Sequence, residues 1–214
     1  MEIMANSLSD IYGGVKQNSE HRRENDLYST PPLVIYAFLK TYDGTVPNNI
    51  IEPCAGKGYI SKELISNGHN VISFDLFKHY ETLQGINITT PVDLFTHDYS
   101  YYGGVITNPP YHKRIPIRLI EKTTKECNFS AFILRTTFLE SANRYTFFKD
   151  NPPTSVWVLS DRMNCDFEDD LKNKQIGGMV SYSIYVWDKN SENKQMLNWI
   201  RLKDFYPSWI KDRC

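Results

Sequence analysis

The segment from Asn49 to Asp75 constrains the fold more than any other part of the chain. A strand-like run, Asn49 to Pro53, leads into the glycine-containing loop Cys54-Ala55-Gly56-Lys57-Gly58. A helical pattern follows, then a second apolar run, Val71 to Phe74, which Asp75 closes. This order is typical of a βαβ unit, in which the glycines let a ligand approach the main chain and the acid meets a ribose.

The spacing inside this unit bears on the kind of ligand. Asp75 follows Gly56 by about 20 residues, as in nucleotide-binding units. The third glycine of the dinucleotide pattern is absent, because Gly56-x-Gly58 is followed by Tyr59-Ile60-Ser61. This departure disfavours nicotinamide and flavin dinucleotides and suits a ligand without a pyrophosphate. A tight strand-to-helix turn that binds nothing would look similar, so the loop alone does not decide.

The rest of the chain continues to alternate strands with helices. We expect further strands at 102–107, 131–134, 155–159 and 180–187, and helices at about 31–42, 117–127 and 141–149. Ser29 or Thr30 is the expected N-cap of the first helix. The alternation predicts an α/β, Rossmann-like fold with a mostly parallel sheet, helices on both faces and an antiparallel edge strand. The tail from Leu197 to Trp209 leaves room for a helix.

Length and composition indicate one intracellular domain. With 214 residues, of which 41% are hydrophobic, the chain is long enough for one sizeable core. Residues 1–27 are polar and unpatterned, so we expect a flexible segment before a single domain at 28–214. The four cysteines are widely spaced without a Cys-x-x-Cys pair, which predicts a reducing compartment and no zinc site. The chain lacks a membrane-spanning apolar stretch and a secretion signal. Its net charge of -1 neither supports nor excludes nucleic-acid binding.

The tetrapeptide Asn108-Pro109-Pro110-Tyr111, which follows the strand-like run 105–107, resembles the catalytic loop of amino-group methyltransferases, which implies chemistry on a planar nitrogen. Such a nitrogen is a poor nucleophile because its lone pair is delocalised into the adjoining π system. The Asn108 side-chain oxygen and the Pro109 carbonyl can each accept one N–H, and the prolines fix both acceptors in advance. Tyr111 would stack on the flat face of the substrate. The alternative is a proline-rich turn in which Tyr111 is half-buried packing.

These features should converge in space. In a parallel α/β sheet, ligands bind at the carboxyl ends of the strands. The glycine loop, Asp75, Asp98 and Asn108 would all leave that end of neighbouring strands. We therefore expect one cleft that holds both a nucleoside-like ligand and the Asn-Pro-Pro-Tyr loop.

On these residues, the chain resembles the S-adenosylmethionine-dependent amino-methyltransferases, and most closely those that act on adenine N6 in DNA. The resemblance covers roughly Tyr28 to Trp187 and implies a Rossmann-like methyltransferase fold, S-adenosylmethionine as cofactor, and no metal. It assigns Asn108, Pro109, Pro110 and Tyr111 to catalysis. The cofactor residues that it implies are Tyr28, Thr30, Pro31, Glu52, Cys54, Ala55, Gly56, Gly58, Asp75 for the ribose, Leu76, Asp98 and Tyr99 for the adenine, and Asn108.

DNA as substrate requires that the adenine be rotated out of the duplex while the protein holds nearby phosphates. The basic residues His112, Lys113, Arg114 and Arg118 adjoin the catalytic motif and are the DNA-binding candidates. A solvated amphipathic helix is the alternative for this segment. Without a separate target-recognition domain, the chain resembles compact phage- or virus-encoded enzymes, which implies the cytoplasm, or that of the host cell. The oligomeric state is not predicted.

Other functions use the same motif. Cytosine N4 in DNA, a base in RNA and a protein glutamine amide each present a planar nitrogen. A non-catalytic methyltransferase-like subunit that binds nucleic acid is a further alternative. The presence of Asn108, Gly56, Gly58 and Asp75 argues against loss of activity.

Overall fold

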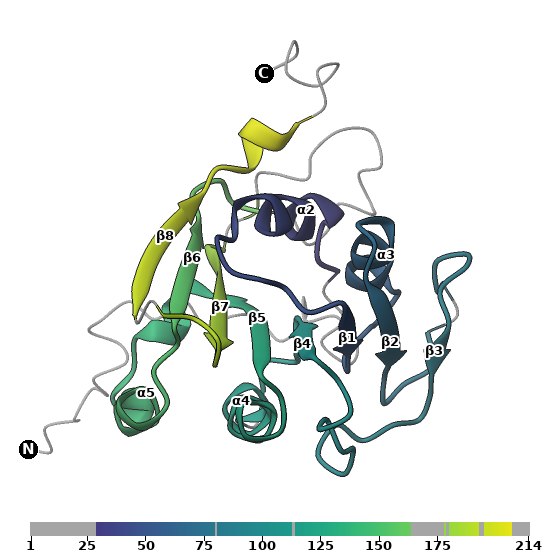
Figure 1. The fold of residues 1–214 in the computed structure, drawn as a ribbon, viewed down its shortest axis with the longest axis horizontal. Helices are drawn as coiled ribbons and strands as arrows, with labels where there is room; N and C mark the ends of the chain where they lie inside the picture. Colours follow the sequence, from purple (N-terminus) through teal and green to yellow (C-terminus); the bar gives the residue numbers. More distant parts are fainter. Residues whose placement is uncertain are drawn as a thin grey trace, which may run out of the picture.

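One mixed sheet organises the part of the chain that the structure describes. A computed structural model describes residues 29–79, 81–112, 114–163, 178, 180–192 and 195–206. Eight strands lie in the order β3-β2-β1-β4-β5-β7-β6-β8 (Figure 1). The strands are β1 (Asn49–Glu52), β2 (Asn70–Phe74), β3 (Ile88–Thr89), β4 (Gly104–Thr107), β5 (Phe129–Arg135), β6 (Ser155–Leu159), β7 (Tyr182–Asp188) and β8 (Met196–Ile200).

Helices cover both faces of this sheet. One face carries α2 (Pro32–Thr41) and α3 (Tyr59–Ser66), and the other carries α4 (Ile115–Glu126) and α5 (Tyr145–Asp150) (Figure 1). Short 3₁₀ turns occupy Thr136–Leu139, Ala142–Arg144 and Leu202–Phe205. The prediction of a Rossmann-like α/β fold with a mostly parallel sheet is confirmed.

The central strands are buried because helices pack on both sides of them. Ile50 and Ile51 of β1 are fully buried, one in each of the two apolar layers. All four residues of β4 are buried as well. At Gly104 a Cβ would lie 2.9 Å from the Phe129 carbonyl oxygen of β5, so this strand pair needs glycine there. Continuous apolar runs of this kind are expected for parallel strands that are covered on both faces.

The position of the antiparallel strand differs from the expectation. We expected it at the sheet edge, whereas β7 is inserted between β5 and β6 and pairs antiparallel with both. The edge strand is β8, which pairs parallel with β6 where the sequence suggested a helix. Its residues run from the exposed Met196 to the buried Ile200. Such a short apolar run is ambiguous in sequence, and pairing with β6 decides its conformation.

The start of the first helix also differs. Pro31, rather than Ser29 or Thr30, takes the N-cap position of α2. The Thr30 hydroxyl instead accepts a hydrogen bond from Asn108. A long-range side-chain contact has therefore replaced the local cap.

The domain division at 27/28 stays a prediction, because residues 1–28 and 207–214 lie outside the described residues. Among the described helices, each is too short or too polar to cross a membrane.

Candidate active site

A cavity of about 300 Å³ opens where β1, β2 and β4 end. These three strands are adjacent and parallel, so the segments that leave their carboxyl ends meet here. The predicted residues that line it are Thr30, Glu52, Cys54, Ala55, Gly56, Asp75, Leu76, Asn108, Pro110 and His112. Residues outside the predicted set that also line it are Ser29, Pro53, Lys57, Tyr59, Ile60, Phe77, His79, Asp93, Leu94, Phe95 and Ile115.

The glycine loop has the left-handed backbone that its sequence suggests. Gly56 has a φ of 54° and Gly58 a φ of 90°, a region that favours glycine. A Cβ on Gly58 would also lie 2.8 Å from the Ile86 side chain. Gly56 lines the cavity, whereas Gly58 is the N-cap of α3 and lies behind the lining. The loop thus leaves main-chain surface facing the cavity.

Asp75 joins the glycine loop to the end of β2. One carboxylate oxygen accepts a hydrogen bond from the Gly56 N–H at 2.8 Å, and the other accepts from the Phe77 N–H at 2.9 Å. The His79 Nε2 lies 3.5 Å from the carboxylate oxygen Oδ1 of Asp75. Because each carboxylate oxygen can accept a second hydrogen bond, Asp75 can hold the loop and still meet a hydroxyl in the cavity.

Glu52 is a buried carboxyl at the cavity wall, with 1% of its surface exposed. The Ser61 hydroxyl donates to it, and the Ser61 and Ser73 hydroxyls lie 2.6 Å apart. Burial raises the pKa of Glu52 to about 8; the Ser61 hydrogen bond opposes this rise, and the nearby Asp75 adds to it. Glu52 is therefore mainly protonated at neutral pH. Burial likewise raises the pKa of the Cys54 thiol, which disfavours a thiolate nucleophile.

Asn108 is held at both ends of its side-chain amide. Its Nδ2 donates to the Thr30 Oγ1 at 3.0 Å, and the Tyr111 hydroxyl donates to its Oδ1. With Nδ2 directed at Thr30, the oxygen of the amide is directed at the Tyr111 hydroxyl. Pro109 is buried beneath this loop, and Pro31 is buried at the start of α2. The Asn108 oxygen is thus occupied by a hydroxyl of the same loop.

Tyr111 lies beside the cavity rather than in its lining. Its ring is 6.4 Å from the Tyr182 ring, centroid to centroid, and the Arg135 guanidinium lies 5.5 Å from its centroid. In this position the Tyr111 ring does not face the cavity, where it was expected to stack on a substrate.

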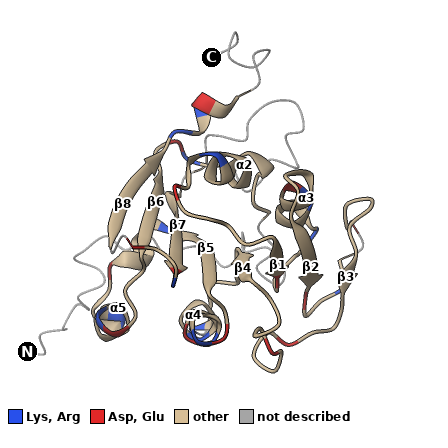
Figure 2. Ribbon diagram, in the orientation of Figure 1, with Lys and Arg blue, Asp and Glu red and all other residues tan. Residues whose placement is uncertain are grey.

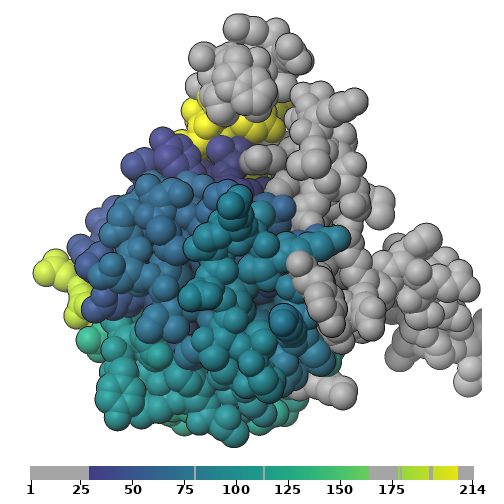
Figure 3. Space-filling view, turned by 90° about the vertical axis from the view of Figure 1, so that its right-hand side faces the viewer, coloured from purple at the N-terminus to yellow at the C-terminus, as the bar shows by residue number. Residues whose placement is uncertain are grey.

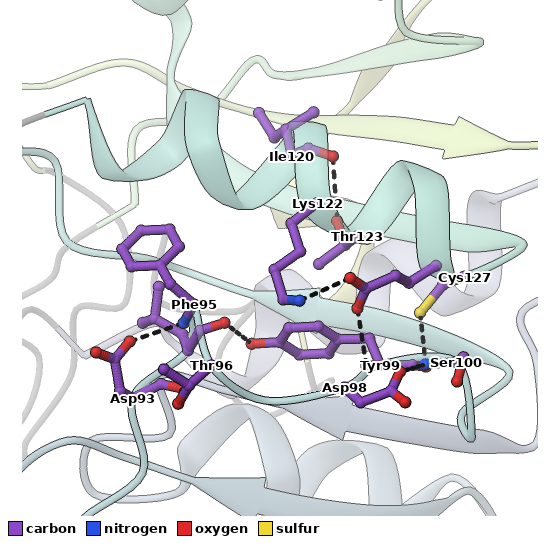
Figure 4. Close-up of polar contacts among 12 residues, drawn as sticks. Asp93, Phe95, Thr96, Asp98, Tyr99, Ser100, Ile120, Lys122, Thr123 and Cys127 are labelled. Atoms are coloured by element: carbon purple, nitrogen blue, oxygen red, sulfur yellow. Dashed lines mark hydrogen bonds and ion pairs between the residues drawn. The ribbon is translucent and has the colours of Figure 1, made fainter.

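The structure places Asp98 and Tyr99 outside the lining of the cavity. Asp98 is exposed, and its carboxylate accepts the Ser100 N–H at 2.9 Å in a local turn, which lowers its pKa. Tyr99 is fully buried, and its hydroxyl donates to the Leu94 carbonyl at 2.9 Å (Figure 4). Neither residue lines the cavity.

Asp93 and Phe95, from the same segment, do line the cavity. The Asp93 carboxylate accepts the Phe95 N–H at 2.7 Å (Figure 4). The segment between β2 and β4 forms much of one side of the molecule, in blue to teal (Figure 3). Strand β3 has only two residues, so the sequence has no alternating pattern that marks where this strand ends. The sequence therefore does not show which acid in this segment reaches the cavity. The available signal was the order acid, apolar residue, aromatic at 93–95.

No protein-family model matches this chain. It is 24% identical over 204 residues to the type II methyltransferase M.AccI from Acinetobacter calcoaceticus, an alignment that covers 87% of this chain and 37% of that protein. The chain thus spans well under half the length of this curated relative.

Solved structures show the same fold. A Vibrio vulnificus protein described as a type I restriction-enzyme modification subunit superposes with a TM-score of 0.53 at 10% identity, over 79% of this chain and 45% of that one. The chain has the Rossmann-like methyltransferase fold. A Lactococcus lactis protein described as a hemolysin also matches, with a TM-score of 0.54 at 8% identity, over 82% of this chain and 95% of that one. The resemblance to methyltransferases is confirmed, while the fold alone leaves the activity open.

The described DNA-binding candidates lie at the cavity and along the first turns of α4. His112 lines the cavity, and Arg114 is exposed at the N-cap of α4. Arg118 is exposed too, but its guanidinium lies over the Phe95 ring. Lys113 and the cofactor candidate Tyr28 lie outside the described residues. Lysine and arginine alternate with acidic residues along α4 (Figure 2).

Proposed function

We propose that this chain transfers a methyl group from S-adenosylmethionine to the N6 amine of an adenine in DNA. The observation that carries the proposal is the position of Asn108. Its side chain leaves the end of β4 and lines the same cavity as the glycine loop and Asp75. A nucleoside site and an amide acceptor for a planar nitrogen thus share one space.

The residues of the cavity fit the cofactor. Bound S-adenosylmethionine supplies a methyl group on a cationic sulfonium. The left-handed Gly56 leaves room for close approach, and Asp75 can accept ribose hydroxyls. Asp93 can accept from an adenine amine while Phe95 offers an aromatic face. Glu52, protonated in the free cavity, can release its proton when a cation binds beside it.

Asn108 performs the substrate chemistry. Its side-chain oxygen and the Pro109 carbonyl each accept one N–H of the target amine, so the nitrogen lone pair turns toward the methyl group. Thr30 keeps the amide in the required orientation, because its hydroxyl accepts a hydrogen bond from Asn108 Nδ2. No strong base is needed, because alignment of the two reacting centres contributes most of the effect.

We infer that the substrate is DNA and that the target base is adenine. A methyltransferase relative of type II and the resemblance of the motif to N6-adenine enzymes support both assignments. Base flipping is required because the amine of a stacked base cannot reach Asn108. His112 and Arg114 lie beside the motif and are the nearest described candidates for phosphate contacts.

The test uses purified protein with methyl-labelled S-adenosylmethionine and, in separate reactions, DNA, RNA or whole-cell protein. Nucleoside analysis is expected to find the label in N6-methyldeoxyadenosine. Label in N4-methyldeoxycytidine, in RNA or in glutamine would overturn the substrate. A calorimetric titration with S-adenosylhomocysteine that shows no binding would overturn the cofactor.

A further inference from the structure

One face of α4 supports the loop that carries Phe95. Arg118, Lys122 and Glu126 recur every four residues and therefore lie on the same side of the helix. Glu126 accepts the Tyr99 N–H at 2.9 Å and pairs with Lys122 at 2.6 Å (Figure 4). The Lys122 ammonium also lies 5.6 Å from the centroid of the Tyr99 ring. This charged face is thus directed toward the 93–99 segment of the same chain.

Among the three residues of this face, Arg118 contacts a residue that lines the cavity. Its guanidinium carbon lies over the Phe95 ring, 3.8 Å from the ring centroid, which is within cation–π distance. Phe95 itself lines the cavity, and its N–H is held by Asp93. The position of this ring therefore depends on the hydrogen bond within its own turn, on packing against one apolar layer and on the cation from α4.

We infer that Arg118 is a positioning residue for the cofactor: it fixes Phe95 as the stacking surface for the planar base of the nucleoside. This inference rests on the proposed function and replaces the sequence-based assignment of Arg118 to DNA. The catalytic loop is joined to α4 through residues 112–115, so the helix that follows the motif also orders the cofactor site.

The experiment compares the full-length protein with Arg118→Ala, Arg118→Lys and the control Lys125→Ala. Lys125 is exposed on the same helix, and its removal deletes one positive charge. For Arg118→Ala we expect the Kd for S-adenosylhomocysteine and the cofactor KM to rise about fivefold, as loss of one cation–π contact predicts. The kcat at saturating cofactor should be unchanged, and Arg118→Lys should restore part of the affinity. Lys125→Ala should leave cofactor affinity at the wild-type value.

Two results would overturn the inference. In the first, Arg118→Ala binds the cofactor like wild type but loses a phosphate contact to DNA. The loss would appear as a decrease of about one in the slope of log K for DNA against log salt concentration. In the second, Lys125→Ala weakens cofactor binding as much as Arg118→Ala, so that charge rather than stacking sets the affinity. Failure of the wild-type protein to bind S-adenosylhomocysteine is a separate outcome, which would overturn the proposed function together with this inference.

Discussion

The Tyr111 hydroxyl donates a hydrogen bond to the Asn108 side-chain oxygen, the atom that the proposed chemistry needs as an acceptor. The Tyr111 ring is meanwhile held near Tyr182 and Arg135. Because the amide oxygen has a second lone pair, a substrate amine can either share it with the hydroxyl or displace the hydroxyl. Because Tyr111 is also the expected stacking partner, one movement of its side chain would free the acceptor and supply the stack.

Substitutions at Tyr111 separate these two roles. Tyr111→Phe keeps the ring and removes the competing donor, so kcat/KM for DNA should be retained or raised by up to about fivefold, the value of one hydrogen bond of about 1 kcal/mol. Tyr111→Ala also loses the stack, so kcat/KM should fall at least about tenfold. Steady-state kinetics on one duplex measures both. Equal losses in the two variants would show that the hydroxyl itself is required.

Asp93 and Asp98 give a matched test of which acid contacts the cofactor adenine in the proposed function. Both carboxylates accept a main-chain N–H two residues ahead, but only Asp93 lines the cavity. Asp93→Ala should raise the Kd for S-adenosylhomocysteine about tenfold or more, because a hydrogen bond to a carboxylate is lost. Asp98→Ala should leave that Kd nearly unchanged. Calorimetric titration checks both, and the reverse ranking would restore the assignment made from sequence.

Thr30 should affect turnover through Asn108. Thr30→Val preserves shape but removes the acceptor for Asn108 Nδ2, so the amide is no longer fixed. We expect kcat to fall about tenfold, equivalent to about 1.4 kcal/mol. Thr30→Ser retains the hydroxyl and should retain most of the turnover. If the valine and serine variants turn over alike, then the Thr30 hydroxyl does not orient Asn108.

Glu52 should make stability depend on pH. Its pKa of about 8 in the folded protein lies above the ordinary value of 4.5, so between these values the folded protein holds a proton that the unfolded chain has lost. The free energy of unfolding should therefore fall as pH rises from about 5 to about 8, by up to about 1.4 kcal/mol per pH unit from this group. Glu52→Gln stays neutral and should lack this part of the slope. Urea unfolding across that range tests the difference, and parallel profiles would contradict it.

The sequence predicts the elements whose causes are local. The β1–α3–β2 unit is visible because its apolar runs, glycine loop and closing acid are contiguous. The meeting of Gly56, Asp75 and Asn108 follows from the rule that parallel strands end on one side of a sheet.

What could not be predicted depends on contacts between distant segments. Strand β3 has only two residues, too few for an alternating apolar pattern in the sequence. The sequence therefore does not show whether Asp93 or Asp98 lies at the cavity. The edge strand β8 exists through its pairing with β6. The basic residue Arg118 looked free for phosphate because its ring partner, Phe95, is more than twenty residues earlier in the chain.

Methyl transfer by wild type and by Asn108→Ala, measured side by side on an adenine-containing duplex with labelled S-adenosylmethionine, tests the central claim most directly. Removal of one of the two amine acceptors is expected to reduce kcat by about a hundredfold or more, while S-adenosylhomocysteine binds both proteins alike. Wild-type turnover in the alanine variant would contradict the role of Asn108 in activating the amine.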